Sequence, residues 1–256
     1  MDLQLAGKAA LITGGSKGIG RAVAERLAEE GCSLHLASRT EDDLARARDA
    51  LNEKYGAQVT IHAADLSDGD RMRQLAADTA GIDILVNNAG AIPAGDVKAV
   101  DEATWRRAWD LKVFGYINLV REVYPAMVER GDGVIVNVIG TAGEAPVPNY
   151  VAGSMGNASI MALTRALGGA SLDDGVRVVA VNPGLIETER MVTIYEVIAE
   201  DRLGDKTRWP ELLANLPQGR AGKPDEVADV ALFLASDASR AVTGQDILVD
   251  RGWRHG

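Results

Sequence analysis

The chain has 256 residues, of which 46% are hydrophobic, and it carries a formal net charge of −10 at pH 7. This length supports one large core, so we expect a single domain over residues 1–256. The acidic balance and the lack of any run of Lys and Arg argue against a nucleic-acid partner. No apolar run approaches the roughly 20 residues of a membrane-spanning helix, and no signal peptide is recognisable, so we expect a cytoplasmic protein that binds small molecules.

The sulfur and imidazole side chains predict no metal site. Cys32 is the only cysteine, and its place between two small residues before an apolar run suggests a core filler. The three histidines, His35, His62 and His255, are isolated in the sequence and show no metal-ligand spacing.

A glycine-rich turn near the N-terminus is the most informative local feature. Residues 8–12 form an apolar run of strand length, and a helical pattern follows over residues 21–30. Glycine permits a tight turn and the close approach of a phosphate, and a helix N-terminus presents free N–H groups to an anion. A purely structural turn is the alternative. The segment therefore predicts a pyrophosphate cradle made of Gly14, Ser16, Lys17, Gly18, Ile19 and Gly20.

The end of the second predicted strand, residues 33–37, bears on the choice of cofactor. A carboxylate at this point binds the ribose 2′-hydroxyl of NAD, whereas an arginine accommodates the 2′-phosphate of NADP. The chain has Ser38 and Arg39 here, and Lys17 could add positive charge. We therefore favour NADP over NAD, although acids at positions 41–43 complicate the local field and the cations could be solvated surface groups.

The next predicted elements are a helix over residues 41–54, a strand over residues 59–63 and a buried strand over residues 82–86. Asp65 and Leu66 follow the first of these strands, where Asp65 could equally cap a turn. The second strand ends in an Asn-Asn-Ala-Gly turn that includes Asn88, Ala89 and Gly90.

The second half of the chain continues the alternation of helices and strands. A long amphipathic helix, broken at Gly115, is predicted over residues 101–130, and a strand follows over residues 133–138. Tyr150 opens another helix. The later predicted elements are a strand from residue 176 into an Asn-Pro-Gly turn, a mixed helical insertion over about residues 187–218, a helix opening at Pro224, and a last strand over residues 242–250.

This order predicts a doubly wound α/β fold, because each parallel step needs a right-handed crossover. We expect a Rossmann-like parallel sheet of seven strands with helices on both faces, and a small lid formed by the insertion. No internal repeat or linker points to a second domain.

Taken together, the T-G-x-x-x-G-x-G, N-N-A-G and N-P-G motifs and Tyr150 resemble the short-chain dehydrogenase/reductase family over essentially the whole chain. The resemblance implies an NAD(P)-dependent oxidoreductase that interconverts an alcohol and a ketone or aldehyde by hydride transfer, with Tyr150 as general acid/base. It implies a homotetramer or dimer built through the helices near Tyr150 and Pro224. The cofactor contacts that it implies are Asp65, Leu66, Asn88, Ala89, Gly90, Tyr150, Pro183, Gly184, Ile186 and Thr188.

Three positions depart from the family's pattern. Lys112 stands at the position of the catalytic asparagine, Gly140 at that of the serine with Thr141 as the nearest hydroxyl, and Ser154 at that of the lysine in Y-x-x-x-K. One hypothesis is that Lys112 supplies the missing cation, with Thr141 or Ser154 donating to the substrate. The alternatives are that the Lys112 side chain points into solvent or forms an ion pair with Asp110 or Glu144.

Two functional classes follow. The first is an NADP-dependent oxidoreductase with a rearranged site, and the alternative is a dinucleotide-binding protein with weakened activity and a regulatory or scaffolding role. Apolar residues of the insertion (Met191, Ile194, Tyr195, Trp209) suggest a partly hydrophobic substrate. Its cations (Arg190, Arg202, Lys206, Arg208) could meet an anionic tail or form a solvated helix face.

Overall fold

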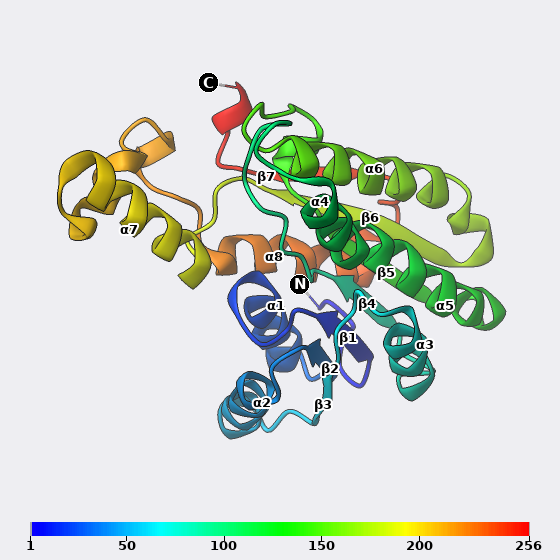
Figure 1. The fold of residues 1–256 in the computed structure, drawn as a ribbon. Helices are drawn as coiled ribbons and strands as arrows, with labels where there is room; N and C mark the ends of the chain where they lie inside the picture. Colours follow the sequence, from blue (N-terminus) through cyan, green and yellow to red (C-terminus); the bar gives the residue numbers. More distant parts are fainter. Residues whose placement is uncertain (1, 256) are drawn as a thin grey trace.

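A computed structural model of the protein, which describes residues 2–255, contains one seven-stranded sheet with the strand order β3-β2-β1-β4-β5-β6-β7. All neighbouring strands are parallel. The predicted doubly wound fold is therefore confirmed (Figure 1). The strands are β1 (Ala9–Thr13), β2 (Ser33–Ser38), β3 (Val59–Ala63), β4 (Ile84–Asn87), β5 (Gly133–Val138), β6 (Val176–Pro183) and β7 (Asp246–Val249).

Helices cover both faces of this sheet, as Figure 1 shows. The helices α1 (Gly18–Glu29), α2 (Glu41–Tyr55) and α8 (Pro224–Ala235) pack on one face. The helices α3 (Gly69–Asp78), α5 (Gly115–Arg130) and α6 (Val151–Gly168) pack on the other. Because β1 leads to β2 on one side and pairs with β4 on the other, the strand order reverses at β1, which is where open α/β sheets bind ligands.

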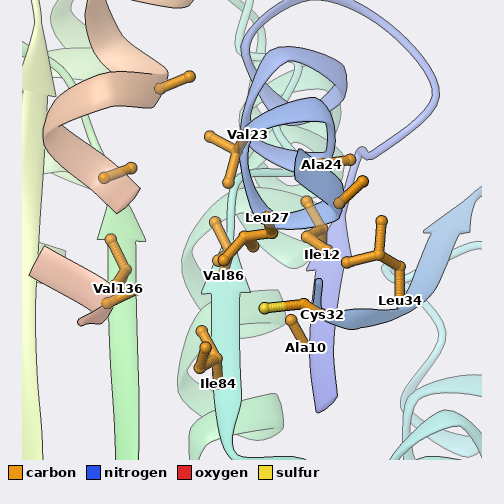
Figure 2. Close-up of a cluster of buried hydrophobic side chains, with 14 of the residues drawn as sticks. Ala10, Ile12, Val23, Ala24, Leu27, Cys32, Leu34, Ile84, Val86 and Val136 are labelled. Atoms are coloured by element: carbon orange, nitrogen blue, oxygen red, sulfur yellow. The ribbon is translucent and has the colours of Figure 1, made fainter. Parts of the chain in front are cut away.

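The core explains why the strands read as unbroken apolar runs. Successive residues of a strand point to opposite faces, and here both faces are covered. Ile12 of β1 packs in the cluster under α1, whereas its neighbour Leu11 packs in the cluster under α5. Figure 2 shows the first cluster, in which Cys32 lies among aliphatic side chains, and the prediction of a core cysteine is confirmed.

The predicted helix over residues 101–130 is interrupted next to Gly115, as expected, but by a type of turn that the sequence did not indicate. Helix α4 (Glu102–Trp109) passes into a π-helical turn, Asp110–Phe114, before α5 begins at Gly115. Single π turns widen a helix locally and are frequent at functional sites. Lys112 lies in the middle of this turn, so the irregularity falls on one of the predicted site residues.

The insertion before α8 folds as helix α7 (Glu189–Leu203) followed by 3₁₀ turns at Lys206–Leu213 and Pro217–Gly219. In Figure 1 α7 and the segment after it project from the layered body. Met191 and Trp209 pack within a small cluster at the base of this insertion, whereas Ile194 is exposed.

The histidines are less isolated than the sequence suggests. His35 and His62 lie on the paired strands β2 and β3, with Nδ1 of the first 3.0 Å from Nε2 of the second. Within residues 2–255, no group of three or more His, Cys, Asp or Glu side chains is arranged to hold a metal ion. None of the helices in this range combines the length and apolar character that a membrane crossing requires.

Candidate active site

A cleft of about 1060 Å³ runs along the carboxyl ends of the central strands. The turns after β1, β4, β5 and β6 form its floor, and the start of α7 and the C-terminal segment form part of its wall. The structure brings most predicted site residues together here. They are Gly14, Lys17, Gly18, Ile19, Asn88, Ala89, Gly90, Lys112, Gly140, Thr141, Tyr150, Pro183, Gly184, Ile186 and Thr188.

The glycine turn is fastened to the turn that follows β4. The amide nitrogens of Asn88 and Ala89 donate to Thr13 Oγ1 at 2.9 and 3.0 Å, and Asn88 Nδ2 donates to the Thr13 carbonyl at 3.0 Å. A Cβ on Gly20 would overlap the Gly14 carbonyl and the Asn88 amide, so only glycine fits there. Ser16 and Gly20 do not line the cleft but shape the turn that does.

Helix α1 opens toward this turn with its first N–H groups uncapped. Its N-cap residue, Lys17, has no side-chain capping hydrogen bond. Free N–H groups at a helix N-terminus together with a glycine cradle match the needs of a pyrophosphate. The residues present therefore suit a dinucleotide.

A second polar feature lies at the carboxyl end of β2, at the same edge of the sheet as the glycine turn. The Ser38 hydroxyl is buried and has no hydrogen-bond partner within the described part of the chain, and Arg39 beside it is exposed. Lys17 Nζ forms an ion pair with Asp43 at 3.0 Å, so part of its charge is already neutralised. No ion pair within 4.0 Å joins Arg39 to a carboxylate of residues 2–255, although its charge acts on Asp65, so Arg39 is the less neutralised of the two predicted cations.

Asp65 and Leu66 lie outside the cleft lining. The Asp65 carboxylate accepts hydrogen bonds from the Ser67 amide and hydroxyl, which lower its pKa together with the charge of Arg39. The Leu66 side chain packs into the core, so its prediction as a cofactor contact is limited to its backbone.

Tyr150 lies one residue before α6, with φ −147° and ψ 41°. Because this backbone is not helical, the four-residue gap to Ser154 does not by itself place the two side chains on one helical face. The Tyr150 ring lies over Gly153 in the first turn of α6. It is so close that a Cβ on Gly153 would overlap Tyr150 Cε1 and Cζ. The absence of a side chain at Gly153 makes room for the phenol.

Two effects act in opposite directions on the pKa of the Tyr150 phenol. Burial raises its pKa above the usual value of about 10, and the charge of Arg190 lowers it. Arg190 lies near the start of α7, and its Nη2 donates to the Ile92 carbonyl at 3.2 Å. The cation that acts on Tyr150 in this structure therefore comes from the insertion.

Lys112 faces the same cleft. Its Nζ donates to the Val138 and Ile139 carbonyls at the end of β5, at 3.1 and 3.0 Å, and lies 5.1 Å from the centre of the Tyr116 ring. Desolvation lowers its pKa to about 8. Neither predicted alternative for this side chain is found, since it does not extend into solvent and forms no ion pair with a carboxylate of residues 2–255.

The predicted hydroxyl donors separate into two cases. Thr141 lines the cleft, but Ser154 does not, because its Oγ is buried and accepts a hydrogen bond from the Val147 amide at 2.9 Å. The assignment of Ser154 to the site is corrected on this ground. Asn157, one turn further along α6, lines the cleft instead.

Gly140 and Asn157 meet at the end of β5. Gly140 has φ +138°, a conformation that side-chain-bearing residues rarely adopt, so a serine could not simply be restored there. Asn157 Nδ2 donates to the Gly140 carbonyl at 3.3 Å, while its Oδ1 is buried without a partner among the described residues.

Several cleft residues were not predicted as site residues. Arg254 Nη2 donates to the Thr141 and Ala145 carbonyls at 2.9 Å each, so the C-terminal segment forms part of the wall. Arg190 was predicted only as a cation of the insertion. The other unpredicted polar or aromatic lining residues are Asn157, Glu189, Thr193 and Trp253, and Tyr195 was predicted only as part of the lid.

The chain is similar to known proteins over almost its whole length. The family profile described as enoyl-(acyl carrier protein) reductase matches residues 14–254. A 3-oxoacyl-[acyl-carrier-protein] reductase of Chlamydia muridarum is 32% identical over 259 residues, covering 98% of this chain and 99% of that protein. L-Sorbose reductase of Gluconobacter frateurii, solved with NADPH and L-sorbose, superposes with a TM-score of 0.95 at 30% identity, with full coverage of both chains. An NAD⁺-bound xylitol dehydrogenase superposes with a TM-score of 0.88 at 26% identity, covering 97% of this chain and 100% of that one.

Proposed function

The chain belongs to the short-chain dehydrogenase/reductase family, and from this premise we propose that it is an NADP-dependent oxidoreductase that interconverts an alcohol and a ketone or aldehyde. Its relatives include enzymes named for carbonyl reduction or alcohol oxidation, and structures similar to it hold NADPH or NAD⁺. Tyr150 is the general acid/base and the insertion over about residues 187–218 is the lid of the one domain.

In this proposal the bound dinucleotide supplies or accepts the hydride. Tyr150 donates a proton to the substrate oxygen during reduction, and the positive charges nearby stabilise the phenolate that remains. Arg190 provides one of these charges, and we assign a second to Lys112, which lines the same cleft. Two of the three Lys112 Nζ protons are held by the Val138 and Ile139 carbonyls, which leaves one for a ligand oxygen in the cleft.

The observation that carries the proposal is the position of the Tyr150 ring over Gly153, beside the cleft-lining residues Lys112, Gly140 and Asn157. A phenol from the residue before the helix is thereby laid across the first turn of α6. We expect Gly153→Ala to displace the ring and lower kcat for ketone reduction by about 10²-fold, the effect of misplacing a reacting group by about 1 Å.

The affinity of this variant for NADPH should stay within a few-fold of wild type, because Gly153 does not line the cleft. Steady-state reduction of a ketone and aldehyde panel, with calorimetry for NADPH, measures both quantities. Gly69→Ala is the matched control, since a Cβ there meets nothing closer than 3.6 Å. Equal kcat in Gly153→Ala and wild type would contradict the assignment of Tyr150 as general acid/base.

The choice of NADP rests on Ser38 and Arg39 at the end of β2. Arg39→Ala should weaken NADPH binding by about tenfold, the worth of a charge-assisted hydrogen bond, and leave NADH binding nearly unchanged. Calorimetry with both dinucleotides tests this. An equal loss for both would show that Arg39 does not contact a 2′-phosphate.

We also propose a cytoplasmic homo-oligomer, a tetramer or a dimer, built through α6 and α8. Exposed apolar residues on these helices support the proposal, with Met155 51% and Phe233 41% exposed. Light scattering after size exclusion should give a mass of two or four chains, whereas a monomer would contradict it.

A further inference from the structure

The cleft carries an excess of positive charge that its contacts within the chain do not neutralise. Four cations line it, Lys17, Lys112, Arg190 and Arg254, against one acid, Glu189. This contrasts with the chain as a whole, whose net charge is −10. An overall acidic protein repels anions at long range, so the local excess points to a site for an anion rather than to a general attraction.

Three of these cations form no ion pair with a carboxylate of residues 2–255. Lys17 is paired with Asp43, whereas within residues 2–255 the side chains of Lys112, Arg190 and Arg254 donate hydrogen bonds only to backbone carbonyls. A guanidinium has five N–H donors, of which Arg190 and Arg254 each direct only Nη2 to a carbonyl. Arg254 Nε is buried and without a partner among the described residues. Donors remain on both arginines for a ligand.

The two arginines lie at the end of the cleft where the chemistry is proposed. Arg190 reaches the loop after β4 through the Ile92 carbonyl, and Arg254 reaches the loop after β5 through Thr141 and Ala145. The pyrophosphate cradle lies at the end of β1 and has its own N–H groups and Lys17. The arginines are therefore placed to meet the substrate, and guanidinium groups bind carboxylates with directed, paired hydrogen bonds.

We propose that Arg190 and Arg254 bind a carboxylate of the substrate, so that the enzyme prefers hydroxy acids and oxo acids to neutral alcohols and ketones. This inference rests on the proposed function for the reaction but concerns only recognition. The lid helix α7 contributes Arg190 and the C-terminal segment contributes Arg254, so two elements far apart in the sequence recognise one group.

Binding of small oxo acids tests the inference without depending on turnover. Acetoacetate, levulinate and their methyl esters are titrated calorimetrically into the full-length protein, with and without NADP. At least one acid should bind about tenfold or more tightly than its ester, as expected for a charge-assisted hydrogen bond. Arg190→Met and Arg254→Met should each bring this ratio toward one, whereas the lid variant Arg202→Met should preserve it.

Acids that bind no better than their esters, or a preference that survives in the Arg190→Met/Arg254→Met double variant, would overturn the inference. Circular dichroism and thermal unfolding identify any variant that does not fold. Failure of the proposed function has a different signature, in which the acids bind preferentially but no ketone is reduced with NADPH. Reduction of neutral ketones without preference for acids would contradict the inference alone.

Discussion

Tyr150→Phe should lower kcat for NADPH-dependent ketone reduction by about 10²- to 10⁴-fold, the usual contribution of a general acid. The substitution removes only the hydroxyl and keeps the ring that lies over Gly153. Packing and cofactor affinity should therefore change little. Steady-state kinetics over the ketone panel, with calorimetry for NADPH, separates the loss of chemistry from a loss of binding.

The control for this variant is Tyr124→Phe. The Tyr124 hydroxyl donates to Asp174 at 2.9 Å, and Tyr124 does not line the cleft, so the same chemical change is made away from the site. Its kcat should equal that of wild type. If Tyr150→Phe retained full turnover, the proton would have to come from another group, and Lys112 would be the first to examine.

Lys112→Met should lower kcat by about 10²-fold, as expected when a preorganised charge is removed from a developing anion. The pH dependence distinguishes this role from a structural one. Since desolvation lowers the Lys112 pKa to about 8, the side chain is charged below pH 8 and loses its proton as the pH rises through that value. Reduction by the wild type should therefore decline above pH 8.

Tyr150 cannot produce this decline, because burial raises its pKa above the usual value of about 10 despite the charge of Arg190. In Lys112→Met the decline near pH 8 should disappear. Lys98→Met, a change at an exposed lysine outside the cleft, serves as the control. An unchanged pH profile in Lys112→Met would show that Lys112 does not act in the reaction.

The same lowered pKa has a consequence for stability. Between about pH 8 and 10.5 the unfolded chain keeps a proton on Lys112 that the folded chain has lost, so the free energy of unfolding should rise with pH in this window. The difference between wild type and Lys112→Met isolates this contribution from other titrating groups.

The fold could be predicted because local and global signals agree. Strand residues such as Leu11 and Ile12 face opposite, covered sides of one sheet, which makes the strands readable as continuous apolar runs. The glycine turn, the Asn-Asn-Ala-Gly turn and the Asn-Pro-Gly turn each follow a strand, so the topology alone brings them to one edge of the sheet.

The arrangement around Tyr150 could not be predicted in the same way. The spacing from Tyr150 to Ser154 equals a helical turn, and the Ser154 amide donates to the Tyr150 carbonyl at 2.8 Å. The backbone at Tyr150 is not helical, however, so the spacing does not fix where its side chain points. Gly153 has no side chain that a sequence pattern could mark as functional. Its importance comes from the Tyr150 ring that packs against it. Only coordinates show that the phenol fills that space.

Arg254 illustrates a second limit. Its contact with Thr141 spans 113 residues of sequence, and Arg254 itself lies in no recognisable motif. The π-helical turn that presents Lys112 is equally invisible, because Asp110–Phe114 has the composition of an ordinary helix. Sites built from long-range contacts and irregular backbone need the folded structure to be found.

Transfer of a deuterium label from NADPH to the product would demonstrate that the protein catalyses hydride transfer. The protein is incubated with NADPH carrying deuterium at the transferable position of the nicotinamide and with the ketone and aldehyde panel, and the alcohol products are examined by mass spectrometry. Deuterated alcohol is expected from at least one substrate with the wild type, together with a large loss of that product with Tyr150→Phe. Tight NADPH binding with no deuterated alcohol from any substrate would contradict this expectation, and would instead favour a dinucleotide-binding protein with a regulatory or scaffolding role.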